Sequence, residues 1–532
     1  MVISAKYGKW SKVILIFFYI FIFFLLLRNS FNYLDPDLGW HLKVGEEIAQ
    51  SRLVPDINNY NYVFSGHWVD HEWLSNFIVY QIYNNFGYLA LSVFFAAVMV
   101  LLLILLNREA RRRYPSVALG FILVLETWGV VASLPHLGVR IQELGILFVV
   151  LLLLIINNYS RRLDWRLLLF LPPLFYLWAS LHASFLLGLG LLAAWMGIKI
   201  FERIIRRFPL FSRLNFFEVL SNRHILFFCG ASVLSIGATL LTPYHVKLYS
   251  FLKDYQNDFY RSHIQEWLSQ FSFPFTYWQL AYLAFVVLSL SLYIYYVRRR
   301  KILSINIWNL FLLLFFVFLS FQSRRHFPLM FVATFWFMLE IQALVWPVIP
   351  NKKPLSYNAW LSVYLLTCLL LVTTFQITQT NFSNRPFQSF CKDYPYESVE
   401  FLKNHREYDD ARLFNHYAWG GYLIWTWPER KTFIDGRLPQ VPLAGHTYLE
   451  EYYEFFKKDG QIGDKLNQYD IALVLLPAQD KNLTAKPWEK FLFMITDEEL
   501  VAHNYLRDYL QSSSNWQILH SDQAAVVYGR NP

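Results

Sequence analysis

Long apolar runs alternate with short polar segments along most of this chain. About 20 helical residues cross a hydrocarbon core of about 30 Å, and these runs approach that length. We count about eleven of them, at residues 13–27, 87–106, 117–135, 141–156, 167–181, 185–201, 224–242, 278–297, 305–322, 327–347 and 358–378. The pattern predicts a polytopic α-helical membrane protein with about eleven transmembrane helices.

The charges between the runs indicate how the helices are threaded, because Lys and Arg concentrate on the cytoplasmic side. Lys6, Lys9 and Lys12 place the N-terminus inside, and no small-residue cleavage site follows the first run. Every basic loop then falls inside; these loops hold Arg108, Arg111, Arg112, Arg113, Arg161, Arg162, Arg166, Arg203, Arg206, Arg207, Arg213, Arg298, Arg299, Arg300, Lys301, Lys352 and Lys353. We expect a multi-pass protein of the plasma (inner) membrane, with two long outer loops, 31–86 and 243–277, and its tail outside.

The tail, residues 381–532, follows a different pattern from the transmembrane domain, residues 1–380. IALVLLP (Ile471 to Pro477) and AAVVYG (Ala524 to Gly529) have the length and composition of strands, and YLEEYYEFFKK (Tyr448 to Lys458) has helical periodicity. About 150 residues is a common domain size. We predict a small extracytoplasmic α/β domain.

Composition supports the membrane class and excludes others. The chain of 532 residues is 56% hydrophobic and 16% charged, with a mean hydropathy of +0.30, which is too apolar for one soluble domain. The net charge of +9 comes from short clusters between apolar runs, which argues against nucleic-acid binding. Three cysteines, Cys229, Cys368 and Cys391, do not make a disulfide framework or a metal cluster.

The first outer loop opens with an unusual polar sequence for a membrane boundary. FNYLDPDLGWHLKVGEEI places Asp35, Asp37, Trp40 and His41 directly after the first span. A structural interpretation is available, in which an Asp-Pro turn leads into an interfacial helix and Trp40 lies in the aromatic belt. The functional interpretation depends on the rest of the loop.

The same loop ends with a second acidic motif. GHWVDHEWLSNFIVYQIYNNFG adds Asp70, His71 and Glu72 before an aromatic, amphipathic stretch. An acidic motif, a polar excursion and a His-x-x-Leu entry at His71 and Leu74 together resemble the GT-C superfamily of membrane glycosyltransferases. That superfamily includes protein O-mannosyltransferases, aminoarabinose transferases and the catalytic subunit of oligosaccharyltransferase. The paired prolines of the mannosyltransferase motif are absent from HEWL.

In the GT-C superfamily the acidic residue of the first outer loop is catalytic, and the donor is a polyprenyl phosphate or diphosphate sugar. The resemblance implies a catalytic Asp37, with Asp35 as its neighbour or substitute. The chemistry suits a carboxylate, because the acceptor hydroxyl loses a proton as it attacks an oxocarbenium-like carbon. The leaving phosphate needs cations, and Arg binds phosphate through bidentate hydrogen bonds.

Arginines occur on the outer side, where the charge rule expects few. Arg324, Arg325 and His326 end the ninth span, and Arg140 lies between the third and fourth spans, with His136 and Glu143 nearby. We predict that Arg324, Arg325, His326 and Arg140 bind the donor phosphate. The alternative is that these side chains only snorkel to the interface, although boundary charges are functional hypotheses by default.

Further candidates for substrate binding lie in the outer loops. His41, His71 and Glu72 belong to the first loop, and His182 stands at the outer end of the fifth span, where a packed helix end is the alternative. Glu266, in RSHIQEWLSQF, has the form Ile-x-Glu, which resembles a short motif in a later outer loop of oligosaccharyltransferases. A surface amphipathic helix would also explain it.

One segment of the tail resembles the W-W-D-Y-G segment of oligosaccharyltransferases. LFNHYAWGGYLIWTWPERKTFIDGR, from Leu413 to Arg437, places Trp419 and Tyr422 around two glycines. The resemblance implies that Trp419 and Tyr422 bind substrate, but the Asp of the motif is absent, so recognition of Asn-x-Ser/Thr does not carry over. A tight turn at Gly420 and Gly421, with Trp419 and Tyr422 in the core, is the structural alternative.

We therefore predict a GT-C-type glycosyltransferase that moves a hexosyl or pentosyl group from a polyprenyl (di)phosphate carrier to a lipid, glycan or protein acceptor outside the cytoplasm. Inversion follows from the resemblance. Asp35 and Asp37 could ligate Mg²⁺ or Mn²⁺ through oxygens, and relatives that use a monophosphate donor need no metal, so both possibilities remain open.

Two other classes of protein share part of this pattern. A polysaccharide polymerase or ligase would depend on outer arginines and histidines and would not need Asp37. A transporter needs polar or broken helices near the midplane; Pro172 and Pro173 break the fifth span, but few acidic residues other than Glu126 and Glu340 lie in the spans.

Overall fold

The structure is a computed structural model, and it divides into two compact units. The first unit comprises Met1–Tyr33, Leu89–Val246 and Ile264–Ser383, and the second comprises Leu34–Tyr88, Lys247–His263 and Asn384–Pro532. The described residues are 3–208, 220–253, 258–300, 306–345, 354–380, 382, 390, 392–443, 445–458, 461–480, 482–501 and 503–531. Arg213, Lys301, Lys352, Lys353 and Cys391, named above, lie outside them.

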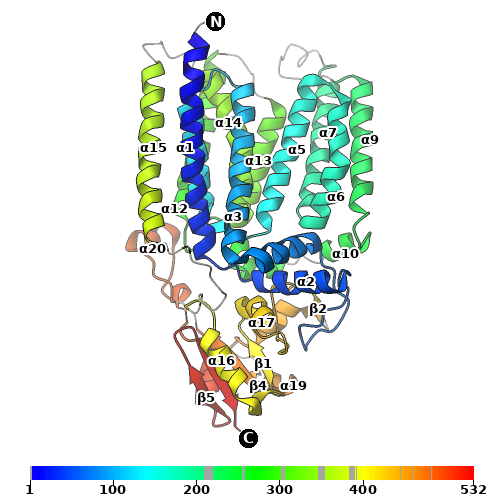
Figure 1. The fold of residues 1–532 in the computed structure, drawn as a ribbon, viewed down its shortest axis with the longest axis vertical. Coiled ribbons are helices and arrows are strands. Elements are labelled where there is room, and N and C mark those ends of the chain that lie inside the picture. The colour runs from blue at the N-terminus through cyan, green and yellow to red at the C-terminus, as the bar shows by residue number, and fades with distance from the viewer. Residues whose placement is uncertain are drawn as a thin grey trace. The chain divides into compact units, whose positions relative to one another are not determined.

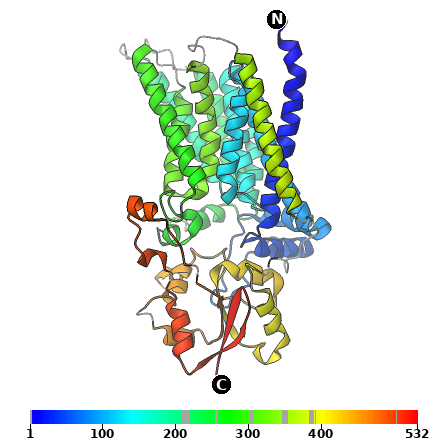
Figure 2. The ribbon, with the colours of Figure 1, turned by 90° about the vertical axis from the view of Figure 1, so that its left-hand side faces the viewer.

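The first unit is a bundle of long apolar helices (Figure 1). They are α1 (Ile3–Asn32), the second arm of α3 (Trp73–Arg113), α4 (Leu119–Ser133), α5 (Gln142–Arg162), α6 (Leu171–Leu181), α7 (Phe185–Ile205), α9 (Asn222–Thr239), α12 (Tyr277–Arg300), α13 (Ile307–Gln322), α14 (Phe327–Val345) and α15 (Pro354–Thr378). Four short 3₁₀ turns accompany them: η1 (Leu134–His136), η2 (Trp165–Phe170), η4 (Gln265–Trp267) and η5 (Arg324–His326). Helix α1 lies along α15 in both Figure 1 and Figure 2, and α6 packs on α9.

Each predicted apolar run overlaps a helix of the described residues, and the run 167–181 overlaps η2 followed by α6. Helices form there because backbone groups in lipid must be hydrogen-bonded within the segment. Among the described residues, seven helices are long and apolar enough to cross a membrane, and three apolar helices are shorter. The prediction of a polytopic helical membrane protein is confirmed, whereas the number of eleven spans stays a prediction.

Two interruptions of the helices have direct causes in the sequence. Pro172 and Pro173 lie in the first turn of α6, where a missing N–H costs no helical hydrogen bond. Gly87 interrupts α3 with φ of 78°, a conformation that favours glycine. The kink separates an arm of the second unit, residues 73–86, from the membrane-length arm of the first.

The second unit contains a four-stranded mixed sheet with the order β1-β4-β6-β5. The strands are β1 (Arg412–Asn415), β4 (Ile471–Pro477), β5 (Trp516–Ser521) and β6 (Ala525–Arg530). Strand β1 pairs parallel with β4, and the other pairs are antiparallel. Apolar side chains of the inner strands are buried, including Leu473, Val474 and Val527. Figure 2 shows β5 and β6 as adjacent red arrows.

The tail also contains helices and turns. They are α16 (Tyr396–Asn404), η8 (Arg406–Tyr408), η9 (Tyr417–Trp419), α17 (Gly420–Thr426), α18 (Tyr448–Glu454), α19 (Ile462–Gln468), α20 (Pro487–Phe493), η10 (Glu498–Leu500) and α21 (Tyr505–Ser512). Of these, α16, α19 and α21 contact the sheet. A short hairpin pairs β2 (Pro442–Leu443) with β3 (His446–Thr447). The prediction of a C-terminal α/β domain is confirmed, although KTFIDGR forms an irregular segment with a single bridge at Thr432 and no strand.

The first outer loop folds together with the tail. Residues 34–88, most of the predicted outer loop 31–86, belong to the second unit, as do α10 (Lys247–Lys253) and α11 (Asp258–His263) from the second outer loop. The predicted domain boundary at residues 380/381 stays a prediction. Helix α2 (Leu38–Ser51) packs on α17 through two glycines, since a Cβ on Gly39 would lie 2.0 Å from the carbonyl oxygen of Gly421. Side chains of ordinary size would prevent this contact.

Candidate functional site

Asp37 lies at the N-terminus of α2 and is half-buried. Its backbone N–H donates to Oδ1 of Asp35 at 2.9 Å, so the Asp-Pro-Asp turn is closed by the first aspartate. The indole N–H of Trp40 donates to Oδ1 of Asp37 at 3.1 Å. Asp35 is buried and closes the turn, whereas Asp37 keeps part of its surface toward solvent.

The carboxylate of Asp37 lies against the backbone of the irregular segment 432–437. A Cβ on Gly436 would be 2.0 Å from Oδ1 of Asp37 and 3.4 Å from Oδ2. Gly420 faces the same segment, because its Cβ would be 2.4 Å from the carbonyl oxygen of Ile434. Gly420, for which a tight turn is the structural alternative, is therefore needed for close packing, as is Gly436.

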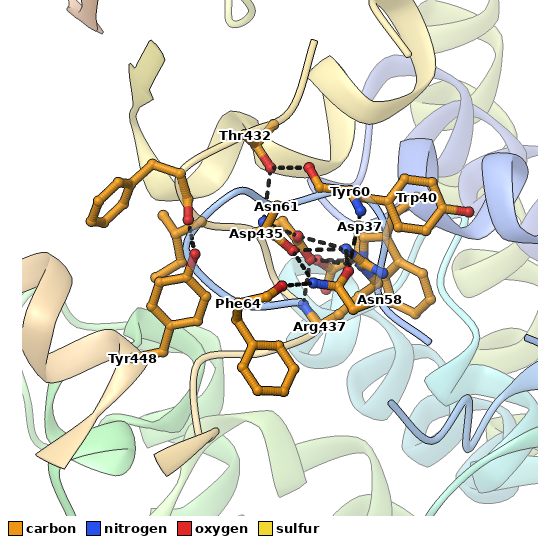
Figure 3. Close-up of polar contacts among 12 residues, drawn as sticks. Asp37, Trp40, Asn58, Tyr60, Asn61, Phe64, Thr432, Asp435, Arg437 and Tyr448 are labelled. Carbon is orange, nitrogen blue, oxygen red and sulfur yellow. Dashed lines mark hydrogen bonds and ion pairs between the residues drawn. The ribbon is translucent and has the colours of Figure 1, made fainter. Parts of the chain in front are cut away.

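A buried ion pair holds this segment in place (Figure 3). Arg437 donates from Nε to Oδ1 of Asp435 at 2.8 Å and from Nη2 to Oδ2 at 2.8 Å, and neither side chain is exposed. Nη2 also donates to Asn58 at 3.1 Å and to Asn61 at 3.3 Å. Asn61 in turn donates to Oδ2 of Asp435 and to Thr432, both at 2.9 Å. The ion pair thus joins the first outer loop to the tail.

Aromatic rings complete the surroundings of Arg437. Its guanidinium carbon lies 4.4 Å from the ring centre of Tyr60 and 4.9 Å from that of Trp68, distances typical of cation–π contacts. Trp68 is fully buried and meets Trp40 edge to face. The same aromatic cluster therefore contacts both Arg437 and the side chain that holds Asp37.

Behind Trp40 lies a buried polar chain. Asn76 donates from Nδ2 to both oxygens of Asp70, at 2.8 and 2.9 Å, and its Oδ1 faces Nδ1 of His41 at 2.6 Å. This amide orientation makes Nδ1 of His41 the donor. The His41 ring packs on Trp40 with 3.6 Å between ring centres. His41 supports Trp40 and, through it, the position of Asp37.

Burial shifts the pKa values of the ionisable side chains in and beside this buried polar chain. It lowers the pKa of His41 to about 3, although the hydrogen bond to Asn76 opposes the shift. Burial likewise lowers the pKa of His71 to about 4, so its 3.7 Å approach to Glu72 is no ion pair at neutral pH. For Asp70, burial raises the pKa to about 7, against hydrogen bonds from Asn76 and Glu72.

A second cluster lies in the helical unit and contains Arg140, which is buried. Arg140 forms an ion pair with Glu266 and donates to the hydroxyl of Tyr33 at 3.3 Å. Burial alone would raise the pKa of Glu266, but the guanidinium groups of Arg140 and Arg325 lower it below its ordinary value. Two residues that the sequence analysis assigns to different tasks are therefore direct partners.

The two arginines of η5 have different environments. Arg324 is buried and donates to the carbonyl oxygens of Ser269 at 3.2 Å, Ser272 at 2.8 Å and Pro274 at 3.2 Å, so it holds the second outer loop. Arg325 is half-buried, with its guanidinium carbon 4.7 Å from the ring centre of Trp267. His326 meets the same Trp267 ring edge-on. Arg325 is the more accessible cation of the pair.

His136 belongs to the same cluster and was not among the predicted site residues. Both of its ring nitrogens are shielded from solvent and have no hydrogen-bond partner among the described residues. Its charged neighbours are Glu266, Arg140, Arg324 and Arg325. Glu143, in the first turn of α5, accepts a hydrogen bond from the backbone N–H of Gly138 at 2.7 Å. The sequence signal for His136 is its spacing of four residues from Arg140 in a short outer loop.

The described residues do not form a metal cage, since no three His, Cys, Asp or Glu side chains gather among them. Asp35 and Asp37 each accept a hydrogen bond at Oδ1, so among the described residues these two carboxylates would hold Mg²⁺ or Mn²⁺ without a third acidic, His or Cys ligand.

The fold has known counterparts among solved structures. The apo crystal structure of the Archaeoglobus fulgidus oligosaccharyltransferase matches with a TM-score of 0.55 and 11% identity, over 92% of this chain and 71% of that chain. The same enzyme tethered to an acceptor peptide with the NVT sequon matches with 0.55 and 10%, over 98% and 74%. AglB from that organism with an inhibitory peptide and a dolichol-phosphate matches with 0.55 and 10%, over 89% and 70%.

The chain shares the fold of these oligosaccharyltransferase structures. The predicted resemblance is confirmed at the level of the fold, which is all that such low identity shows. No family model and no curated protein matches the sequence.

The remaining predicted site residues are mainly packed. His182 caps α6 and lies 2.7 Å from the hydroxyl of Ser184. Trp419 is buried and donates to the carbonyl oxygen of Asp393 at 3.1 Å, and Tyr422 is buried and stacks on Tyr394. A role of Trp419 and Tyr422 in substrate binding stays a prediction, and their burial favours an indirect one.

We predict that His41 makes the protein sensitive to acid. An ordinary His binds a proton near pH 6.5, whereas folded His41 does so only near pH 3, so the unfolded chain binds more protons between these values. Stability should therefore fall as the pH is lowered through this range, by up to about 1.4 kcal/mol per pH unit. In His41→Gln, the thermal unfolding midpoint should fall less steeply between pH 6.5 and 4.

The matched control is His503→Gln, because His503 is exposed. This variant controls for the loss of a histidine side chain as such. An unchanged slope in His41→Gln would show that His41 is protonated in the folded protein.

Proposed function

We propose that this protein transfers a sugar from a polyprenyl phosphate or diphosphate carrier to an acceptor on the extracytoplasmic face of the membrane, with inversion at C1. The GT-C fold over most of the chain carries this proposal, together with a half-buried carboxylate, Asp37, in its first outer loop. The printed descriptions of the matched structures name an acceptor peptide and a dolichol-phosphate for those proteins. We extend the class of donor, not the peptide acceptor, to this chain.

In the proposed reaction, the bond between C1 of the sugar and the carrier phosphate oxygen breaks, and the acceptor oxygen bonds to C1 from the opposite face. Asp37 accepts the proton of the acceptor hydroxyl, a role that typically contributes about 10² to 10⁴-fold. The indole of Trp40 and the turn closed by Asp35 orient the Asp37 carboxylate. The carrier phosphate leaves with the electron pair of the broken bond.

The leaving phosphate needs a cation, and Arg325 is our candidate within η5. Its half-buried position over Trp267 leaves its planar group able to bind an anion. Arg324 is committed to three carbonyl oxygens, and Arg140 to Glu266. We propose supporting roles for these two arginines, and for His326 a role in holding Trp267.

The orientation remains part of the proposal: the N-terminus inside, and the first loop and the tail outside. It follows from the basic loops of the sequence. The acceptor would then be a lipid, glycan or protein outside the cytoplasm. His71, Glu72, His182, Trp419 and Tyr422 would shape its binding through packing.

Asp37→Asn keeps the size of the side chain and removes its charge. We predict that it reduces turnover with a lipid-linked sugar at least about 10²-fold, while donor binding and the thermal midpoint change little. Asp56→Asn is the matched control in the same loop, because Asp56 is exposed and hydrogen-bonds through its backbone carbonyl. Full activity of Asp37→Asn would contradict the proposal, and would favour the polymerase or ligase chemistry that depends on arginines.

Arg325→Ala should raise the KM for the donor or lower kcat at least about tenfold, and Arg325→Lys should restore little because Lys has no bidentate geometry. Arg223→Ala is the control, since Arg223 also lies over an aromatic ring, that of Phe227, at 5.3 Å. Kinetics should be measured with purified protein in nanodiscs. If Arg325→Ala keeps the wild-type kcat and donor KM, Arg325 does not bind the donor phosphate and is only an interfacial residue.

A further inference from the structure

The segment 432–437 is fixed along its length by buried hydrogen bonds. The N–H of Thr432 donates to the carbonyl oxygen of Tyr60 at 2.9 Å. Asn415, at the end of β1, accepts from the N–H of Phe433 at 2.8 Å and donates to the carbonyl oxygen of Ile434 at 2.9 Å. These contacts come from both sides of the segment, so it has little freedom to shift.

Its far end is equally constrained. The N–H of Arg437 donates to Oδ1 of Asp435 at 2.9 Å, which closes a tight loop around Gly436. The ion pair between these two side chains is sealed from solvent, and Asn61 donates to Asp435 from the first outer loop. Gly436 is thus a fixed point on a rigid loop.

Gly436 is not required by backbone conformation. Among the described glycines, only Gly87 and Gly445 have positive φ. What a side chain on Gly436 would meet is the Asp37 carboxylate, with Oδ1 at 2.0 Å and Cγ at 3.0 Å from the added Cβ. Outside residues 435–437, the three nearest heavy atoms all belong to the Asp37 carboxylate, Oδ2 being the third at 3.4 Å.

We propose that Gly436 is a positioning residue for Asp37: the rigid loop of the tail sets where the carboxylate of the first outer loop stands. This inference rests on the proposed function of Asp37. Gly436 then acts beside the Trp40 indole, which holds Oδ1, and the turn closed by Asp35, because its backbone limits how closely the carboxylate approaches. The tail is part of the catalytic apparatus, although almost 400 residues of sequence separate the two sites.

Adding one carbon at Gly436 should move the Asp37 carboxylate without moving the backbone of the segment 432–437. The backbone is held, and the colliding group is the end of a short side chain, so the carboxylate should rotate away at little cost to folding. A displacement of about 1 Å in a reacting group can cost about 10²-fold in rate. Gly436→Ala should therefore damage the chemical step far more than it damages the fold or donor binding.

The test uses the full chain in nanodiscs with a polyprenyl-phosphate sugar that the wild type accepts. In Gly436→Ala, kcat should fall about 10 to 10²-fold, while the donor KM and the thermal midpoint stay near the wild-type values. In the Asp37→Asn background, Gly436→Ala should cause no further loss, because the carboxylate that it displaces is already gone.

Gly463→Ala is the matched control. Its added Cβ would also meet the end of a side chain, the hydroxyl of Tyr509 at 2.6 Å, in the same unit but in a different contact. This variant should keep wild-type kcat. If Gly436→Ala lowers the thermal midpoint, adding Asp37→Ala should restore it by removing the colliding group.

Several results would overturn the inference. Normal kcat in Gly436→Ala beside an inactive Asp37→Asn would leave the proposed function intact and remove the role of Gly436. Independent, multiplicative losses in the double variant, or a midpoint that Asp37→Ala does not restore, would also remove it. Full activity of Asp37→Asn would overturn the proposed function, and this inference with it.

Discussion

The ion pair between Asp435 and Arg437 has no contact with solvent and determines how the second unit is built. Burying two charges is costly, and such pairs often stabilise no more than apolar residues of the same volume would. Breaking one by removing a partner is different, because about 3–5 kcal/mol is lost when a buried charge stays behind. Arg437 also requires oxygen acceptors from Asn58 and Asn61. The first outer loop therefore cannot leave the tail without stranding buried polar groups.

This dependence explains the close contacts around Asp37. Once the loop is held, α2 can lie on α17 only because Gly39 and Gly421 have no side chains. The helix begins at Asp37, which is thereby brought onto the backbone of Gly436. The second cluster, in the helical unit, is held differently: the buried Arg324 donates hydrogen bonds to carbonyl oxygens of one loop. A carboxylate is positioned by excluded space and hydrogen bonds, and an arginine cluster is positioned by backbone acceptors.

The sequence predicts the local features well because their causes are local. An unbroken apolar run must be helical in lipid, so each predicted run overlaps a helix. The strand at Ile471–Pro477 follows from its β-branched and apolar residues. The pairing of Asn61 with Thr432 and Asp435 joins residues more than 370 positions apart, and no pattern in a single chain reveals such a partner. For the same reason, the hydrogen bonds of Arg324 to carbonyl oxygens could not be predicted from its residue type. The burial of Trp419 and Tyr422 agrees with the structural alternative that their aromatic side chains allow.

The central claim is that this GT-C fold transfers a sugar from a lipid carrier, and it is tested most directly with purified full-length protein. The protein should be incubated in nanodiscs with a panel of sugars on polyprenyl phosphate and diphosphate, with released carrier and product analysed by mass spectrometry and NMR. The account predicts that at least one carrier is consumed, with inverted configuration at C1 of the product. Transfer with retained configuration, or no consumption of any carrier by folded protein supplied with lipid, glycan and peptide acceptors, would contradict it.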